Sequence, residues 1–211
     1  MHSKEEAYKL SSPTSHKRYY DKWASKYDEE FVFAEKYKYP ENIVDTFRKM
    51  GGINHSPIAD IGCGTGVLGE QFIGEMVVLD GYDISSAMLR QAKKKNAYRN
   101  LIECDLSKPN ALPKNHYGAV ISCGTFTIGH LGPEYLTKVV DTLVKGGLGV
   151  IGINKEHFLD KNFDGEVTSM KSRRQIKNVN FVEVEIYGGD SEKELQDISN
   201  ERLSTILTFN K

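Results

Sequence analysis

The 211-residue sequence has no apolar run near the roughly 20 residues that a membrane-spanning helix requires; its most apolar stretch is 148–153. It has three cysteines, Cys63, Cys104 and Cys123, whose spacing suits neither a disulfide framework nor a zinc ribbon. Neither charge dominates, with 28 Lys and Arg against 29 Asp and Glu. The N-terminus lacks the apolar core of a secretion signal. We therefore expect a cytoplasmic protein with no membrane partner, no nucleic-acid partner and no metal site.

The composition is that of a globular domain, with 39% hydrophobic and 27% charged residues. At this length one domain is expected. Residues 1–16 are polar and predict a flexible N-terminus, while 17–211 predict a single domain. Within that domain, 17–52 predict leading helices that form part of a site cover.

Aromatic residues mark the first of these helices. Tyr20, Trp23, Tyr27 and Phe31 follow one another at spacings of three, four and four, which predicts one helical stripe across 19–33. Such a stripe is typical of plain core packing as well as of a binding site. A second helix is expected to begin at Pro40 and to end before 51–52.

Strand-like and helical stretches alternate along the rest of the chain. The expected strands are 57–61, 76–79, 101–102, 117–122 and 148–153. The expected helices are 67–73, 85–95 and 133–144. This alternation predicts an α/β fold, a doubly wound and mostly parallel sheet with helices on both faces. Residues 181–187 and 203–209 alternate with period two, so a C-terminal antiparallel hairpin is expected across the polar segment 188–201.

The strongest local signal is a glycine-rich loop after the first strand. Asp60 is followed by Ile61, and then by Gly62, Gly64 and Gly66 at alternate positions, where a helix is expected to begin. Glycines allow the backbone to turn tightly and to approach a ligand closely. The carboxylate of Asp60 suits a ligand ammonium and opposes a phosphate.

The same loop also matches a second pattern. Residues 64–69 fit the dinucleotide fingerprint G-x-G-x-x-G, which would suit an NAD-type oxidoreductase. Asp83, at the end of the next strand, can hold two ribose hydroxyls in either class of cofactor. Asp80 is a rival for that role, but Asp83 is preferred because a helix start follows it.

Two further strand ends carry candidate site residues. Asp105 can accept a hydrogen bond from an adenine amino group, while the Leu106 N–H can donate to a ring nitrogen. Ser122, Cys123 and Gly124 end the fourth strand. In an open parallel sheet, ligands bind at the carboxyl ends of the strands where the strand order reverses. All these residues are therefore expected to line one crevice.

The chain resembles the class I S-adenosylmethionine-dependent methyltransferases in four segments: Asp60-Ile-Gly-Cys-Gly-Thr-Gly, Gly81-Tyr-Asp83-Ile-Ser, Cys104-Asp105-Leu and Val144-Lys-Gly-Gly147. Residues 20–28 and 124–133 resemble, more narrowly, a small methyltransferase-like branch that includes the Williams–Beuren-region protein. Ile128 departs from that branch, where a second His is expected. The resemblance implies a Rossmann-like sheet of seven strands.

The resemblance also implies roles for individual residues. Met88 would lean on the adenine, although ordinary helix core is an equal alternative, and Tyr20 and Tyr27 would close over the cofactor. His130 is the candidate general base, with a structural His as the alternative. The implied cofactor-binding residues are Tyr20, Tyr27, Asp60, Gly62, Cys63, Gly64, Thr65, Gly66, Asp83, Ile84, Met88, Cys104, Asp105, Leu106, Ser122, Cys123 and Gly124.

The expected function is methyl transfer from S-adenosylmethionine to a small-molecule acceptor, with S-adenosylhomocysteine as the product. Two alternatives remain at this point: the NAD-type oxidoreductase, and an S-adenosylmethionine-binding module without turnover. The roof of the site is expected to come from 19–33, 125–133 and 155–178.

Overall fold

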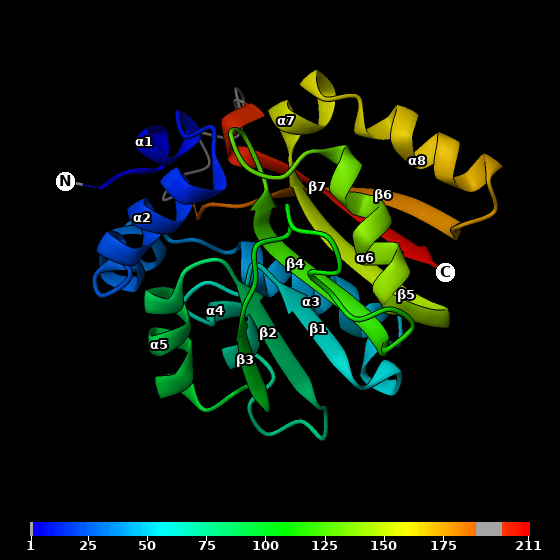
Figure 1. Cartoon of the computed structure of the whole chain (residues 1–211), viewed down its shortest axis with the longest axis horizontal. Coiled ribbons are helices and arrows are strands. Elements are labelled where there is room, and N and C mark those ends of the chain that lie inside the picture. Colours follow the sequence, from blue (N-terminus) through cyan, green and yellow to red (C-terminus); the bar gives the residue numbers. More distant parts are fainter. Residues whose placement is uncertain (1, 189–199) are drawn as a thin grey trace.

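The computed structural model describes residues 2–188 and 200–211, and Figure 1 shows its elements. A seven-stranded sheet forms the centre, in the order β3-β2-β1-β4-β5-β7-β6. The strands are β1 (Ile58–Ile61), β2 (Leu79–Asp83), β3 (Asn100–Glu103), β4 (Tyr117–Phe126), β5 (Leu143–Asn154), β6 (Lys177–Glu185) and β7 (Leu203–Asn210). The strand order reverses between the parallel neighbours β1 and β4, because the chain proceeds from β1 outward to β2 and β3 on one side and from β4 outward to β5 on the other.

The α-helices are α1 (Lys4–Tyr8), α2 (Pro13–Trp23), α3 (Tyr39–Lys49), α4 (Val67–Glu70), α5 (Ser86–Lys95), α6 (Leu136–Thr142), α7 (Lys155–Asp160) and α8 (Phe163–Ser172). Shorter or wider helical turns are η1 (Asp28–Phe33), η2 (Gly52–His55), η3 (Pro133–Tyr135) and η5 (Asn200–Arg202). Among the described residues, none of these helices is long and apolar enough to cross a bilayer.

The predicted doubly wound fold and C-terminal hairpin are confirmed. Strands β1 to β5 pair in parallel, whereas β7 is antiparallel to both β5 and β6. The segment expected to join the hairpin, 188–201, lies largely outside the described residues. This arrangement places the carboxyl ends of β1, β2, β3 and β4 at one edge of the sheet.

Alternate residues of the central strands pack on opposite faces of the sheet. Ile121 and Val150 belong to a core that includes α3 and α4, whereas their neighbours Val120 and Ile151 belong to a core that includes α6 and α8. The central strands are therefore buried on both faces, as their nearly continuous apolar sequences predict.

Two expected elements are displaced. The strand expected at 76–79 begins only at Leu79, because parallel pairing with Ile58–Ile61 sets its register and leaves Met76 exposed. The helix expected over 133–144 ends at Thr142, and Leu143 already pairs with Tyr117 in the sheet.

The single leading helix expected over 19–33 is also wrong. Helix α2 begins earlier, at Pro13, because Ser12 caps it together with Ser15, and it ends at Trp23. The chain resumes as the wider turn η1. Residues 1–16 are helical in part, at α1 and the start of α2, and their flexibility stays a prediction.

Candidate active site

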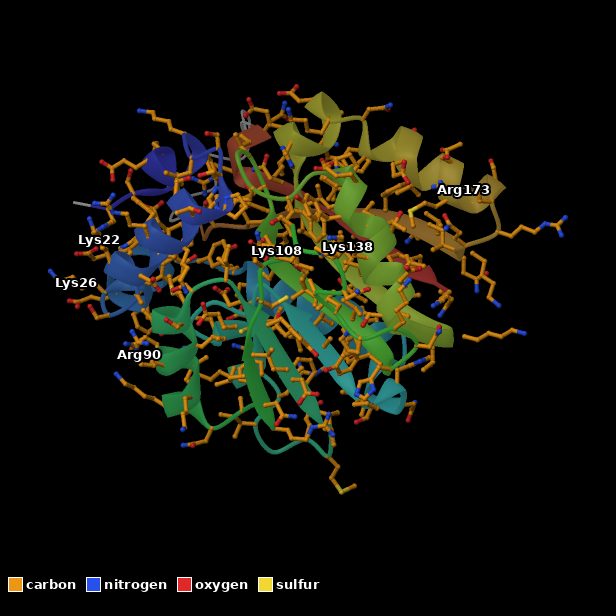
Figure 2. All side chains as sticks on the ribbon, viewed as in Figure 1. Lys22, Lys26, Arg90, Lys108, Lys138 and Arg173 are labelled. Atoms are coloured by element: carbon orange, nitrogen blue, oxygen red, sulfur yellow. The ribbon has the colours of Figure 1, made fainter. Side chains whose placement is uncertain are left out.

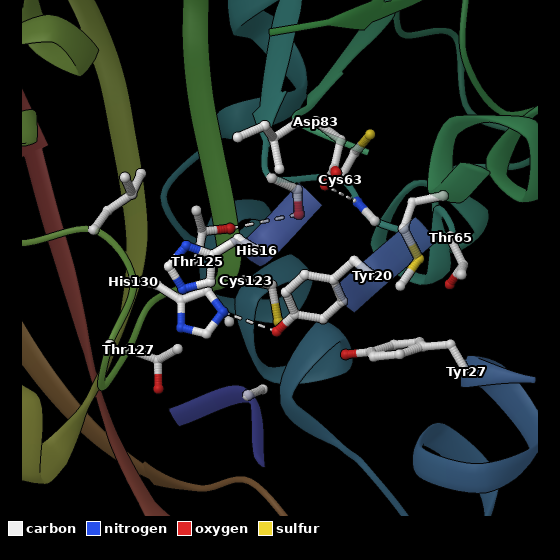
Figure 3. A pocket seen from close by; sticks show the side chains of 18 of the residues that line it. His16, Tyr20, Tyr27, Cys63, Thr65, Asp83, Cys123, Thr125, Thr127 and His130 are labelled. Atoms are coloured by element: carbon white, nitrogen blue, oxygen red, sulfur yellow. Dashed lines mark hydrogen bonds between the residues drawn. The ribbon is translucent and has the colours of Figure 1, made fainter. Parts of the chain in front are cut away.

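A cavity of about 430 Å³ lies over the carboxyl ends of β1 to β4. The N-terminal segment, from α1 to the start of α3, covers it from the other side and contributes His16, Tyr20 and Tyr27 to its lining (Figure 3). The cavity therefore lies at the reversal of strand order, which is where ligands bind in open α/β sheets.

Most of the residues expected to bind a cofactor line this cavity. Those that do are Tyr20, Tyr27, Asp60, Gly62, Cys63, Gly64, Thr65, Asp83, Ile84, Met88, Cys104, Asp105, Leu106, Cys123 and Gly124, together with the candidate base His130. Gly66 and Ser122 do not line it. An added Cβ on Gly66 would lie 3.0 Å from Ala92, and the Ser122 hydroxyl donates to the Ile61 carbonyl at 2.7 Å, so both residues serve packing.

Only one of the two carboxyl oxygens of Asp60 has a hydrogen-bond partner among the described residues. The Tyr98 hydroxyl donates to its Oδ2 at 2.7 Å, whereas Oδ1 is buried without a hydrogen-bond partner in the described part of the chain. Burial raises the pKa of Asp60 to about 7. A ligand donor at this position would satisfy Oδ1 and favour the charged carboxylate.

Asp83 fixes the glycine loop against the β2–α5 turn. Its Oδ2 accepts from the Gly64 N–H at 2.9 Å, and its Oδ1 accepts from the Ser85 N–H at 2.8 Å. Burial raises the pKa of Asp83 to about 6. The rival Asp80 lies away from the cavity and pairs with Arg99, so the preference for Asp83 agrees with the geometry.

Two glycines of the loop are constrained differently. Gly62 has φ +73°, and an added Cβ would lie 1.8 Å from the Thr125 hydroxyl. Gly64 has φ +53° with nothing within 4 Å of an added Cβ, so open space lies above it. Gly62 is thus required by the protein itself, while Gly64 leaves room for a ligand.

His130 has both ring nitrogens engaged. Nδ1 lies 2.9 Å from the Ile128 carbonyl, which can only accept, so Nδ1 carries the hydrogen. Nε2 therefore accepts the hydrogen bond from the Tyr20 hydroxyl at 2.9 Å (Figure 3). Burial lowers the pKa of His130 to about 4. The ring of His16 lies beside it, tilted by 36°, with the two centroids 4.3 Å apart. The imidazole is neutral at pH 7, and its acceptor nitrogen is occupied by a phenol.

All three cysteines line the cavity. Cys63 and Cys104 are buried and Cys123 is half-buried, and burial raises the pKa of each thiol. In residues 2–188 and 200–211, no three His, Cys, Asp or Glu side chains gather in a way that could hold a metal ion. The thiols are therefore protonated, apolar parts of the cavity wall at neutral pH.

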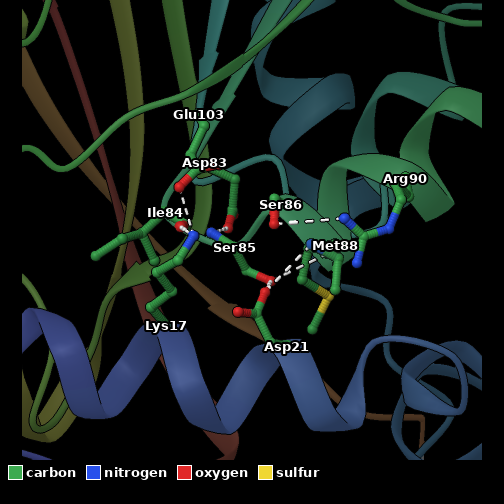
Figure 4. Close-up of polar contacts among 10 residues, drawn as sticks. Lys17, Asp21, Asp83, Ile84, Ser85, Ser86, Met88, Arg90 and Glu103 are labelled. Atoms are coloured by element: carbon green, nitrogen blue, oxygen red, sulfur yellow. Dashed lines mark hydrogen bonds and ion pairs between the residues drawn. The ribbon is translucent and has the colours of Figure 1, made fainter.

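Helix α2 is fastened to the turn that carries Asp83. Figure 4 shows Lys17 donating to the Ile84 carbonyl at 3.2 Å and pairing with Glu103. It also shows the Asp21 carboxylate accepting from the Ser85 hydroxyl at 2.7 Å. The cover is thus held by polar contacts next to the expected ribose position.

Sequence reasoning missed several residues of the cavity. His16 lay within the segment expected to be loose, although Ser12 followed by Pro13 is a helix-start signal. Tyr37 and Tyr187 also line the cavity, as Phe31 and Trp23 do. The roof expected from 155–178 does not reach it; the described lining includes Asn154 but no residue of α7 or α8.

Three of the positively charged side chains labelled in Figure 2 lie on different elements. Lys22, Arg90 and Arg173 lie on α2, on α5 and just after α8, as Figure 2 shows. The absence of a nucleic-acid partner stays a prediction.

Comparisons with known proteins agree with this geometry. Residues 58–147 match the family model described as a methyltransferase domain. A comparison with curated proteins gives no significant match. The structure is similar to magnesium protoporphyrin IX methyltransferase (ChlM) from Synechocystis PCC 6803, solved with bound SAM, with a TM-score of 0.64 and 15% identity over 96% of this chain and 98% of that one.

Two other solved structures are also similar. A SAM-dependent methyltransferase from Archaeoglobus fulgidus has a TM-score of 0.58 and 18% identity over 87% of this chain and 100% of that one. DhpI in complex with SAH has a TM-score of 0.61 and 16% identity over 94% of this chain and 96% of that one. The chain therefore has the methyltransferase fold, and its β1–β5 half is similar to a methyltransferase domain.

Proposed function

We propose that this protein is an S-adenosylmethionine-dependent methyltransferase whose acceptor is a small molecule. The observation that carries the proposal is the cavity at the ends of β1 and β2, where the unpartnered Asp60 Oδ1, the open space above Gly64 and the buried Asp83 come together. These features fit a ligand whose ammonium group meets Asp60, whose body lies close to the backbone at Gly64, and whose two hydroxyls meet Asp83. The SAM and SAH bound to ChlM and DhpI support this choice of cofactor.

Different residues of the cavity would bind different parts of such a cofactor. Asp60 would accept from its ammonium, and Asp83 would accept from the ribose hydroxyls. Asp105 and Leu106 would meet the adenine edge, with Met88 against the adenine face. When bound, S-adenosylmethionine supplies a methyl group already activated by a sulfonium.

The chain itself would contribute position and shelter. Tyr20 and Tyr27 line the cavity on the side of the cover. They would exclude water from the sulfonium of a bound S-adenosylmethionine. Alignment of two reactants can supply about 7–11 kcal/mol of a barrier, so no covalent assistance is needed. His130, the predicted base, would act through the Tyr20 hydroxyl that occupies its Nε2.

The oxidoreductase alternative is not favoured. Gly69, the last glycine of the dinucleotide fingerprint, packs against the ring of Tyr98, and the Gly69 N–H donates to the Tyr98 hydroxyl at 3.1 Å. That pattern also leaves Asp60 and the terminal hairpin unexplained.

Thermal unfolding with four ligands tests the proposal. S-adenosylmethionine and S-adenosylhomocysteine should raise the melting temperature by several degrees, because a ligand at 100 times its dissociation constant adds about 2.7 kcal/mol. NAD and NADP should not. The Asp83→Ala variant should keep the fold and lose most of the shift. A rise with the nicotinamide dinucleotides alone would contradict the proposal, and binding of S-adenosylmethionine without turnover of any acceptor would favour a binding module.

A further inference from the structure

Five aromatic side chains form one continuous side of the cavity, which we call the aromatic wall. Its members are Trp23, Tyr27, Phe31, Tyr37 and Tyr187. Neighbouring ring centroids lie 4.9, 5.2, 4.8 and 5.7 Å apart in that order. The wall comes from the cover and from the segment after β6. Of its members, only Tyr27 is also among the residues expected to hold the cofactor.

The wall reaches the end of β4, where residues expected to contact the cofactor also lie. The Tyr37 hydroxyl lies 3.8 Å from Cys123 Sγ, at the end of β4. An added Cβ on Gly124 would lie 3.0 Å from the same hydroxyl. A molecule resting on the wall would therefore adjoin a cofactor bound over β1 and β4.

The charges around the cavity favour cations. Among the described lining residues, four carry carboxyl groups, Asp60, Asp83, Asp105 and Glu134, and one, Lys4, carries an ammonium. That ammonium itself stands over the Tyr187 ring, 4.5 Å from the centroid. The outer end of the wall thus already carries a cation on an aromatic face.

The wall stays neutral across the physiological pH range. Burial raises the pKa of Tyr27 and of Tyr37 well above the ordinary value, so neither phenol ionises near pH 7. The predicted base, His130, already accepts a hydrogen bond from Tyr20. An acceptor that has a lone pair available without prior deprotonation suits such a site.

We propose that the methyl acceptor is an aromatic amine or a ring nitrogen that is unprotonated near pH 7, and that the aromatic wall holds the positive charge that this nitrogen acquires. This inference rests on the proposed function. The nitrogen lone pair forms the new N–C bond while the C–S bond pair returns to sulfur, so the positive charge passes from sulfur to nitrogen. A proton carried by the nitrogen then leaves to water.

Ligand binding to the S-adenosylhomocysteine-saturated protein tests the inference without turnover. Benzyltrimethylammonium, a cation like the product, should bind at least tenfold more tightly than benzyl alcohol or benzoate in calorimetry. Tyr37→Leu should weaken binding of the cation at least fivefold, whereas Tyr37→Phe, which keeps the ring, should stay within twofold of the wild type. S-adenosylhomocysteine affinity is measured first in each protein.

The outcomes separate the two proposals. Failure of the wild type to bind S-adenosylhomocysteine removes the proposed function and the inference with it. Normal S-adenosylhomocysteine binding with no preference for the cation, or with equal losses in Tyr37→Leu and Tyr37→Phe, overturns the inference alone. If Tyr37→Leu loses S-adenosylhomocysteine binding, the pair Tyr187→Leu and Tyr187→Phe decides by the same criterion.

Discussion

The Tyr20 hydroxyl donates to Nε2 of His130 across 2.9 Å, and this bond joins the N-terminal cover to the loop after β4. Because Nδ1 donates to the Ile128 carbonyl, the tautomer of the ring is fixed. The pair therefore holds a neutral imidazole in the folded protein, which gives the stability of the fold a dependence on pH.

Acid should destabilise the wild type more than the His130→Gln variant. Burial lowers the pKa of His130 to about 4 in the fold, whereas an unfolded His titrates near 6.5. Between these values the unfolded chain binds a proton that the fold does not, so up to roughly 3 kcal/mol is lost as the pH falls from about 7 to 4. His130→Gln should not lose this part of the free energy of unfolding. Asp60 and Asp83, whose pKa values are raised in the fold, affect the pH dependence in the opposite sense, but they do so equally in both proteins. Urea unfolding at pH 7.5, 6 and 5 measures the difference, and parallel pH profiles would rule out a buried neutral His130.

S-adenosylhomocysteine should bind more tightly at pH 8 than at pH 6. Burial raises the pKa of Asp60 to about 7, so its carboxylate, the form that attracts an ammonium, becomes populated across this range. Asp60→Asn should weaken binding roughly tenfold at pH 8 and flatten the profile. 5′-Methylthioadenosine, which lacks the ammonium, serves as the control ligand in calorimetry. An equal loss for both ligands in Asp60→Asn would show that the carboxyl does not face the ammonium.

Gly62→Ala should be far more damaging than Gly51→Ala. Both glycines are left-handed, at φ +73° and +74°, so each substitution carries about 1–2 kcal/mol of backbone strain. Only at Gly62 would the new Cβ overlap the Thr125 side chain, while nothing lies within 4 Å at Gly51. Overpacking adds about 1–3 kcal/mol. Denaturant midpoints of the two variants give the comparison, and equal losses would mean that Thr125 moves aside freely.

Asp21→Ala should loosen the cover. Its carboxylate accepts from the Ser85 hydroxyl and from the Ala87 N–H, and the loss of these bonds should cost about 1–3 kcal/mol. Hydrogen exchange should accelerate in α2. Asp45→Ala is the matched control, because Asp45 is exposed and its pair with Arg48 at 3.5 Å should contribute under about 1 kcal/mol. Unchanged exchange in α2 of Asp21→Ala would show that other contacts hold the helix.

Local sequence signals predicted the sheet and the glycine loop well, because they depend on short-range chemistry. Asp60 and the glycines after it predict a strand followed by a turn and a helix, and the two segments with period-two alternation predict the hairpin. The second strand was misplaced because the apolar run 76–79 resembles a buried strand, whereas pairing with β1 selects Leu79–Asp83 instead. No local pattern could supply that register.

The N-terminal cover was harder to predict than the strand ends that line the other side of the cavity. Nothing in the sequence at Ala24 marks the end of α2, since no glycine or proline lies there. The contact between Tyr37 and Tyr187 joins residues that are far apart in the chain, so it depends on the completed sheet. Residues whose roles depend on tertiary contacts were accordingly the ones missed.

The aromatic wall lies entirely outside the segment 58–147 that resembles a methyltransferase domain. If the wall holds the acceptor as proposed, substitutions at Trp23 or Tyr187 should alter which molecule is methylated without changing the glycine loop. Recombination or directed evolution restricted to 1–40 and 186–188 should explore new acceptors while the rest of the chain is inherited unchanged.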